Sequence, residues 1–279
     1  MRLIKTTDIT NVIEDMLIDA CENIPNDVLN IIQQAKTKEQ SPIGKMVLNK
    51  IIENDDYATN YHLPICQDTG IVVCFLEIGY DAHIDGDIYE AINEGVRRAY
   101  QKGYFRKSVV RHPIDRINTT DNTPAITHIK LVSGDKLKIT LTCKGAGSEN
   151  MSAVKMLTPA DGIEGIKKFV IDTVIKAGGK PCPPIIVGLG IGGDFELSTI
   201  LAKKALLREL NDENPDPILN KLEKELLVEI NNQGIGPMGF GGTTTCLSVK
   251  ANSYPCHIAS LPVAVNIQCH ASRHKTKTL

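Results

Sequence analysis

From Leu63 onward, short apolar runs rich in β-branched residues alternate with longer segments whose apolar residues recur at helical spacing. The run IVVCFLEIGY at 71–80 predicts a strand, and DGDIYEAINEGVRRAYQKG at 85–103 predicts a helix that ends at its final glycine. The segments before Leu63 show helical spacing. The sequence therefore predicts a mixed α/β (α+β) fold, with a largely helical part carrying one strand at 1–103 and a mixed α/β part at 104–279.

The second part divides into further elements by the same criteria. Residues 125–143 predict a hairpin, because Ser133, Gly134 and Asp135 supply turn residues between two strand-like runs. A glycine-rich strand is predicted at 183–193. Helices are predicted at 161–179, 194–210 and 216–234, and strands at 243–252 and 259–269.

Polar, glycine-rich segments stand at the ends of many of these elements. They are CQDTG, RHPIDRINTTDNTPA, KGAGSENMS, GGKPCPP, GLGIGGDF, GIGPMGFGGTTT and CHIASLPVAVNIQCHASRH. One or two such segments would be explained as tight turns. Seven of them, carrying charged side chains and isolated cysteines, indicate a site that a rigid scaffold assembles from several loops.

Composition narrows the class of protein. The formal net charge is −2, aromatic residues make up 4% and tryptophan is absent, which argues against a nucleic-acid partner. The N-terminus has no apolar signal-peptide core and no run reaches membrane-spanning length. We therefore expect a cytoplasmic protein with no membrane partner.

The segment GLGIGG at 188–193 literally fits G-x-G-x-x-G, which opens an alternative of another class, a nicotinamide-dependent oxidoreductase. The acidic residue that this motif requires after a second strand is missing, and the next two elements read as helices. A strand-to-helix turn whose backbone N–H groups face an anion is the more plausible interpretation.

The eight cysteines are dispersed, with no C-x-x-C pair, so a zinc ribbon or a disulfide framework is not expected. Most read as small buried hydrophobic residues. Cys66, Cys182 and Cys269 instead lie in polar or proline-framed turns, which suits thiolate ligands that meet in space. Cys256, beside His257, is the competing candidate.

The chain resembles the iron–sulfur-dependent hydro-lyases: class I fumarate hydratases, and the α subunits of two-subunit fumarate and L-tartrate dehydratases. The resemblance covers nearly the whole chain and rests on LPICQDTG, DNTPA, KGAGSEN, KPCPPIIVGLGIGG, LEKELLVEINNQGIGPMGFGG and HIASLPVAVNIQC. It implies that Cys66, Cys182 and Cys269 hold a [4Fe–4S] cluster. Three thiolates leave one iron without a protein ligand, and that iron is a Lewis acid for the hydroxyl group of malate.

The resemblance also implies roles for other residues. Asp68 matches a catalytic residue of the family that takes part in proton transfer. Substrate contacts match Gln67, Arg106, the backbone at Gly145, and His257. From its own chemistry, Lys144 is a candidate to hold a substrate carboxylate.

The assignment of Arg106 is the loosest of these matches. Arg111 and Arg116 are close to it in the sequence, so the sequence leaves open which of the three arginines binds a carboxylate.

Single-chain members of the family continue into a second domain that supplies further catalytic residues, whereas this sequence stops soon after Cys269. The resemblance therefore implies an α subunit that needs a β subunit and forms a dimer of αβ units. The expected reaction is the reversible hydration of fumarate to L-malate. L-Tartrate dehydration is the alternative within the class, and a scaffold with a structural cluster is an alternative outside it.

Overall fold

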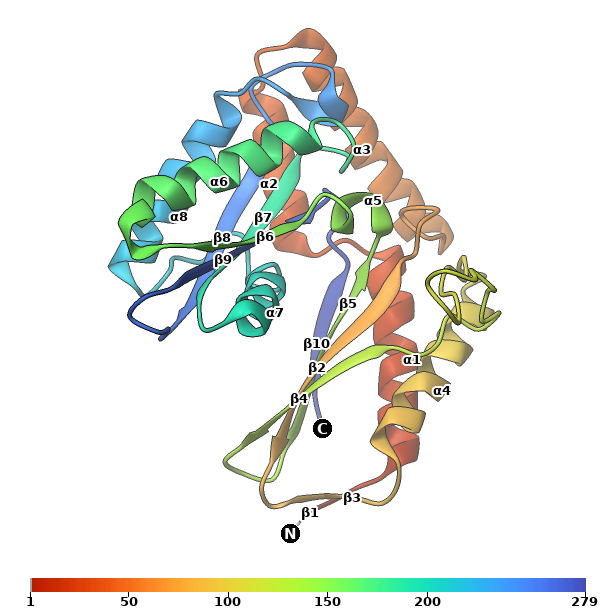
Figure 1. Cartoon of the computed structure of the whole chain (residues 1–279). Helices are drawn as coiled ribbons and strands as arrows, with labels where there is room; N and C mark the ends of the chain where they lie inside the picture. The colour runs from red at the N-terminus through yellow and green to blue at the C-terminus, as the bar shows by residue number, and fades with distance from the viewer. Residues whose placement is uncertain (1) are drawn as a thin grey trace. The chain divides into compact units, whose positions relative to one another are not determined.

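The computed structural model describes residues 2–279, which form two compact units (Figure 1). The first unit comprises the described residues up to 25 together with 54–146 and 272–279. The second unit comprises 26–53 and 147–271. The predicted division near residue 104 does not coincide with these units, because the chain passes between them several times and distant segments share one sheet.

The first unit is built on a four-stranded sheet in the order β10-β5-β2-β4. Its strands are β2 (Ile71–Gly79), β4 (Ile126–Val132), β5 (Leu137–Lys144) and β10 (His274–Thr278). Helices α1 (Thr6–Glu22) and α4 (Ile88–Lys102) supply apolar residues that form a single core with β2 and β5. A short parallel pair, β1 (Arg2–Ile4) with β3 (Ala82–Ile84), completes the unit.

The predicted hairpin at 125–143 is wrong. Strands β4 and β5 both exist, but β2 lies between them, parallel to β4 and antiparallel to β5. The turn between them passes around the end of β2, where the backbone N–H of Gly79 donates to the carbonyl of Lys136 at 2.8 Å. Local turn chemistry could not reveal a strand inserted from 50 residues earlier, since such pairing is non-local.

The second unit contains a sheet in the order β6-β9-β7-β8. Its strands are β6 (Ala153–Leu157), β7 (Ile185–Gly192), β8 (Cys246–Tyr254) and β9 (Leu261–Gln268). Apolar residues of α6 (Gly162–Ala177) and α8 (Pro217–Asn231) form one core with β7, β8 and β9. Helix α7 (Phe195–Ala205) packs on β7 and β9 from the other face (Figure 1).

The glycines of GLGIGG do not form a phosphate-binding loop. Gly188 and Gly190 lie inside β7, where a Cβ would come within 2.2 Å of the Ala202 carbonyl oxygen and 1.9 Å of the Ser198 carbonyl oxygen. They let α7 pack closely on the strand. The first N–H groups of α7 face the carboxylate of Asp194, which accepts from the Leu197 N–H at 2.8 Å. Because Gly188 and Gly190 serve helix packing inside a strand, the nicotinamide alternative loses its basis, whereas the interpretation that this turn faces an anion stays a prediction.

The remaining helices are α2 (Asn26–Lys38), α3 (Pro42–Tyr61) and the short α5 (Ala146–Glu149), and single 3₁₀ turns occur at Pro159–Asp161 and Pro237–Gly239. The predicted helix at 194–210 ends early, at Ala205. Strands β6 and β10 have no counterpart among the predictions, because both are only five residues long and β10 is polar throughout. Among residues 2–279, no helix combines the length and apolar character needed to cross a bilayer.

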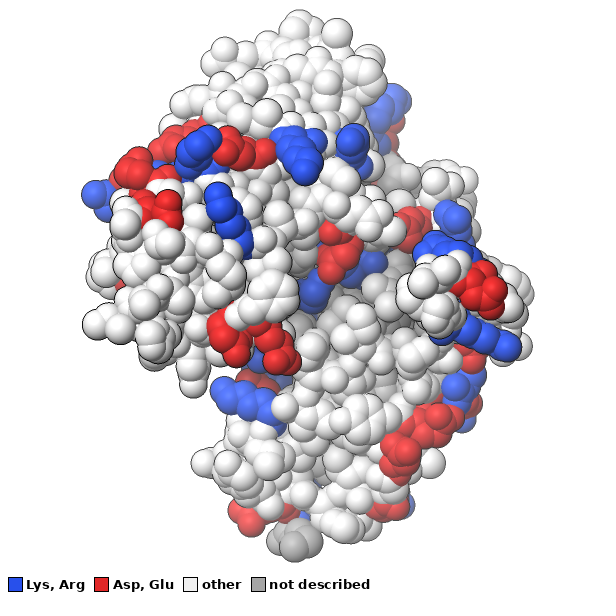
Figure 2. All heavy atoms as spheres, in the orientation of Figure 1, with Lys and Arg blue, Asp and Glu red and all other residues white. Residues whose placement is uncertain are grey.

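Acidic and basic side chains are interspersed over the visible face of the molecule, as Figure 2 shows. This mixture agrees with the formal net charge of −2 and gives no broad field of one sign on that face.

Candidate functional site

In the first unit, residues 66–70 form a polar turn directly before β2. Two buried side chains hold its C-terminal end. The hydroxyl of Tyr100, on α4, donates to the carbonyls of Thr69 at 2.8 Å and Gly70 at 3.1 Å. The amide of Asn122 donates to the Gly70 carbonyl at 3.2 Å, and its oxygen accepts from the Ser108 N–H at 2.7 Å. The turn is thus fixed by side chains that donate to its carbonyls.

The carboxylate of Asp68 is oriented by backbone donors. One oxygen accepts from the Gly70 N–H at 3.0 Å and the other from the Ala146 N–H at 2.8 Å. Arg273, which is 1% exposed, donates to the backbone carbonyl of Asp68 at 2.7 Å. The KGAGSEN segment therefore begins beside the turn that carries Cys66, Gln67 and Asp68.

Two glycines permit this close approach. Gly70 has a φ of +74°, and a Cβ there would lie 2.5 Å from the carbonyl oxygen of Lys144. A Cβ on Gly145 would lie 3.1 Å from a carboxylate oxygen of Asp68. Bare backbone at Gly145 beside the Asp68 carboxylate is the geometry expected where main chain and ligand approach each other.

Among the three arginines, Arg106 is the one tied to this turn. Its backbone carbonyl accepts from the hydroxyl of Thr69 at 2.8 Å, and its side chain is exposed. Arg111 and Arg116 are also exposed, but their backbone N–H groups bond to Ile117 and His112 in the loop that follows. Which of the three arginines binds a carboxylate stays open, since the bond that ties Arg106 to the turn is made by its backbone. Lys144, at the end of β5, is buried, and its substrate-binding role stays a prediction.

In the second unit, strand register brings Cys182 and Cys269 to the same end of the sheet. Strands β7 and β9 are antiparallel, with Ile186 opposite Gln268. Cys182 precedes the start of β7 and Cys269 follows the end of β9. Since the start of one strand lies beside the end of its antiparallel neighbour, the two cysteine turns are neighbours.

The Cys182 turn exposes its thiol from an unusual backbone conformation. Cys182 is exposed, and its φ of 55° lies in the left-handed region that non-glycine residues rarely adopt. Its N–H donates to the carbonyl of Gly179 at 3.1 Å, and the carbonyl of Pro183 accepts from the Met238 N–H at 2.7 Å. Such a conformation costs about 1–3 kcal/mol and persists only when its surroundings hold it.

The second half of KGAGSENMS lies at the same end of this sheet. The hydroxyl of Ser152 accepts from the amide of Asn266 at 2.7 Å and from the Ile267 N–H at 3.0 Å. Glu149 accepts from Asn266 at 2.8 Å and pairs with Lys203 of α7 at 2.5 Å. These bonds fasten the loop to the end of β9 that leads to Cys269.

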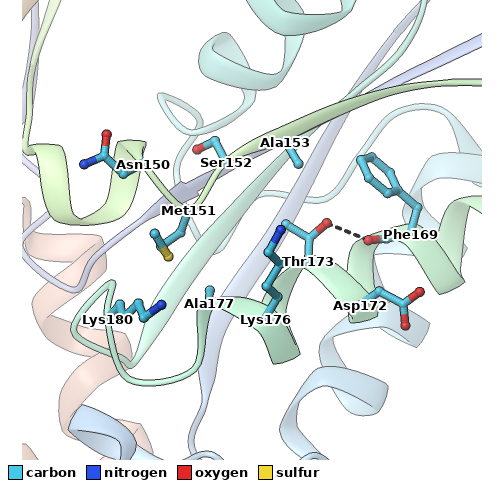
Figure 3. Close-up of a pocket in the computed structure, with 10 residues that line it drawn as sticks. All are labelled: Asn150, Met151, Ser152, Ala153, Phe169, Asp172, Thr173, Lys176, Ala177 and Lys180. Atoms are coloured by element: carbon cyan, nitrogen blue, oxygen red, sulfur yellow. Dashed lines mark hydrogen bonds between the residues drawn. The ribbon is translucent and has the colours of Figure 1, made fainter.

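A cavity of about 290 Å³ opens beside this loop (Figure 3). Asn150 to Ala153 line one side and the C-terminal half of α6 lines the other. Lys176 and Lys180 contribute ammonium groups, Asp172 contributes a carboxylate, and Met151 and Phe169 contribute apolar surface. Lys180 is two residues before Cys182, so the cavity adjoins the end of the sheet that carries the cysteine turns. Its lining therefore combines two cations and one anion with amide and apolar groups.

His257 lies at the opposite end of the same sheet. It belongs to the connection between β8 and β9, where its Nδ1 accepts from the Ala259 N–H at 3.1 Å. Strand β9 separates it from Cys269, and eight extended residues span about 26 Å. Within this unit His257 therefore lies apart from the Cys182 and Cys269 turns, and its role as a substrate contact stays a prediction.

The other cysteines differ from the three candidates in environment. Cys74 and Cys246 are buried, and burial raises the pKa of each thiol to about 12. Cys21 and Cys143 are buried with their sulfurs 3.7 Å apart. The raised pKa values make Cys74 and Cys246 poor thiolate donors, and Cys21 and Cys143 are enclosed in the apolar core of the first unit. Cys256 is exposed in the His257 turn, at the end of the sheet away from Cys182 and Cys269.

The accessible thiols at the turns fit a cluster that takes cysteine thiolates as ligands. Cys66 and Cys269 are partly exposed and Cys182 is exposed. Cys66 belongs to the first unit and the other two to the second. Within either unit, no three His, Cys, Asp or Glu side chains among residues 2–279 converge as ion ligands.

Sequence reasoning missed three residues that hold the Asp68 turn. The sequence pattern indicated only that Tyr100 is one apolar position of a helix and that Arg273 belongs to a basic tail. Asn122 appeared only within the DNTPA motif. An arginine close after an apolar strand was the only available signal for Arg273. Its burial follows from β10, which no pattern predicted.

Comparisons with known proteins identify the family of the chain. A sequence model of the fumarate hydratase (Fumerase) family matches residues 10–278. The putative L(+)-tartrate dehydratase subunit alpha of Methanocaldococcus jannaschii is 45% identical over 278 residues, which cover 97% of each chain. The L(+)-tartrate dehydratase subunit alpha of Escherichia coli K12 is 30% identical over 272 residues, 96% of this chain and 89% of that protein. The chain therefore belongs to the fumarate hydratase (Fumerase) family, which includes these tartrate dehydratase alpha subunits.

Proposed function

We propose that this chain is the cluster-bearing α subunit of a two-subunit hydro-lyase that reversibly hydrates fumarate to L-malate. The observation that supports the proposal is the antiparallel register of β7 and β9, because Cys182 precedes the start of β7 and Cys269 follows the end of β9. Cys66, on the polar turn of the first unit, is the third ligand. When bound there, a [4Fe–4S] cluster would supply a Lewis-acidic iron for the hydroxyl group that is added or removed.

The chain's own residues have separate tasks in this proposal. Hydration adds a hydroxyl group to one alkene carbon and a proton to the other, so the site must bind two carboxylates and move a proton. Asp68 is the candidate for proton transfer, because its carboxylate is fixed by two backbone N–H groups. Arg106, Gln67 and the backbone at Gly145 lie on or beside the same turn and are candidates for substrate contacts.

The names of the two relatives, which are both called subunit alpha, support the inference that a β subunit exists. We propose that the partner completes the catalytic residues, and that two αβ units associate in the cytoplasm. The purified α chain alone is then expected to show little or no turnover.

L-Tartrate dehydration is the second candidate. It is favoured by the names of the two relatives, both of which refer to L(+)-tartrate dehydratase. L-Malate and L-tartrate are four-carbon dicarboxylates that differ by one hydroxyl group. The cavity beside the KGAGSEN loop, lined by Lys176, Lys180 and Asp172, does not discriminate between them.

The test is anaerobic reconstitution of the chain with ferrous iron and sulfide, together with a candidate β subunit. Turnover is then measured with fumarate, L-malate and L-tartrate. Hydration of fumarate at a higher kcat/KM than tartrate dehydration supports the first candidate, and the reverse order supports the second. Activity on neither, from a reconstituted αβ complex, contradicts the proposal.

A further inference from the structure

Glu39 lies in the short connection between α2 and α3 of the second unit, and its side chain is 1% exposed. Carboxylates are almost never buried to this degree unless they are paired or hydrogen-bonded. Glu39 is far in sequence from every motif described above. Its burial nevertheless links the connection to the glycine-rich segment at 234–245.

The carboxylate of Glu39 accepts hydrogen bonds from two parts of the chain. From its own connection, the N–H groups of Gln40 and Ser41 donate at 2.8 and 2.9 Å. From the glycine-rich segment, the N–H groups of Thr243 and Thr244 donate at 2.9 and 2.8 Å. Burial raises the pKa of Glu39, but these hydrogen bonds outweigh it and lower the pKa to about 2. The group is therefore an ionised acceptor that joins the two segments.

Two glycines leave room for this side chain. A Cβ on Gly44 would lie 2.9 Å from the Glu39 carboxyl carbon, and a Cβ on Gly242 would lie 2.8 Å from a carboxylate oxygen. Gly242 also has a φ of +136°, which a side chain would not tolerate. Gly44 and Gly242 thus lie against the Glu39 carboxylate without side chains, and the carboxylate fills the space that a Cβ at either position would occupy.

The segment that Glu39 holds packs directly on the Cys182 turn. Its Met238 N–H donates to the carbonyl of Pro183, the residue after Cys182, at 2.7 Å. A Cβ on Gly239 would lie 2.8 Å from the Cα of Gly179, so the two backbones touch. At the end of the segment, the Thr245 carbonyl accepts from the Ile185 N–H at 2.8 Å.

We propose that Glu39 is a positioning residue for the iron–sulfur cluster: its carboxylate fixes the 236–245 segment, which in turn holds Cys182 in its left-handed backbone conformation. The inference rests on the proposed function for the cluster itself. The link from Glu39 to the Cys182 turn concerns this chain alone and is measurable without any metal.

The first test is amide hydrogen exchange of the metal-free full chain. In Glu39→Gln, the carboxamide loses the charge and presents an N–H₂ group toward backbone donors. Exchange at 236–245 and at 178–184 is expected to rise by about tenfold or more. The matched control is Glu223→Gln. Glu223 is also buried and accepts from Arg208, Asn214 and the Ala251 N–H, at contacts remote from the Cys182 turn.

The second test measures iron release to a chelator from the anaerobically reconstituted chain. Glu39→Gln is expected to release iron about tenfold faster than wild type, and Glu223→Gln at the wild-type rate. Unchanged exchange at 178–184 with wild-type iron release overturns the inference and leaves the proposed function standing. A wild-type chain that takes up no iron overturns the proposed function and the cluster role of Glu39 together.

Discussion

The turn that carries Cys66 and the turn that carries Cys182 are held in different ways. In the first unit, side chains bond the turn directly: Tyr100 and Arg273 both donate to its carbonyls. In the second unit, the Cys182 turn is held through a glycine-rich segment that is itself fastened by Glu39. The first turn depends on its unit's core, whereas the second depends on one buried carboxylate.

The largest effect is expected from the ligands themselves. Cys66→Ser, Cys182→Ser and Cys269→Ser should each abolish cluster uptake, because an alkoxide is a poor substitute for thiolate on iron. Iron and sulfide per chain after anaerobic reconstitution measure this. Cys256→Ser is the matched control and should load normally. Loss of the cluster in Cys256→Ser, with normal uptake in Cys269→Ser, would show that the ligand set is wrong.

Asp68→Asn tests whether the first turn contributes chemistry as well as a ligand. The amide keeps one oxygen acceptor but cannot exchange a proton, so kcat of the αβ complex should fall by roughly 100- to 10,000-fold. Cluster content should stay near the wild-type value. A variant that retains full turnover would remove Asp68 from the catalytic assignment.

The pH dependence of stability tests the second turn. The pKa of Glu39 is about 2 in the folded chain against an ordinary value near 4.5, so its ionised form stabilises the fold above pH 4.5. This contribution is about 3 kcal/mol and is lost as the pH falls from 4.5 toward 2. The stability difference between wild type and Glu39→Gln, measured by urea unfolding, should shrink between pH 6 and pH 3. A constant difference would contradict the assignment.

Tyr100→Phe makes the smallest change. It removes the donor to the Thr69 and Gly70 carbonyls while keeping the buried ring, which should cost about 1–3 kcal/mol of unfolding free energy. Urea unfolding measures it, and Tyr80→Phe, at an exposed tyrosine, is the control. In the same variant, amide hydrogen exchange should become faster at residues 66–70 and stay unchanged at residues 178–184. Equal changes at both turns would mean that the turns are not held independently.

The sequence was informative where structure follows local pattern. Strand β2, helix α4 with its end at Gly103, and the location of Cys66 and Cys182 outside the apolar elements were all predicted correctly. Buried thiols such as Cys74 were predicted from their apolar neighbours, and burial does raise the pKa of that thiol.

The clearest failure concerns pairing between distant segments, because whether 125–143 is a hairpin depends on β2, which lies between the two predicted strands. The early end of the predicted helix at 194–210 is a local failure. Glu39 had no signal of its own, because its partners are about 200 residues away.

The central claim is that the cysteine turns hold a cluster at which a four-carbon dicarboxylate reacts. The most direct measurement is the electron paramagnetic resonance spectrum of the reduced, reconstituted αβ complex before and after L-malate or L-tartrate is added. The account predicts that one of these substrates shifts the spectrum of the wild-type complex. A loaded cluster whose spectrum neither substrate changes, in a complex with no turnover, would contradict it.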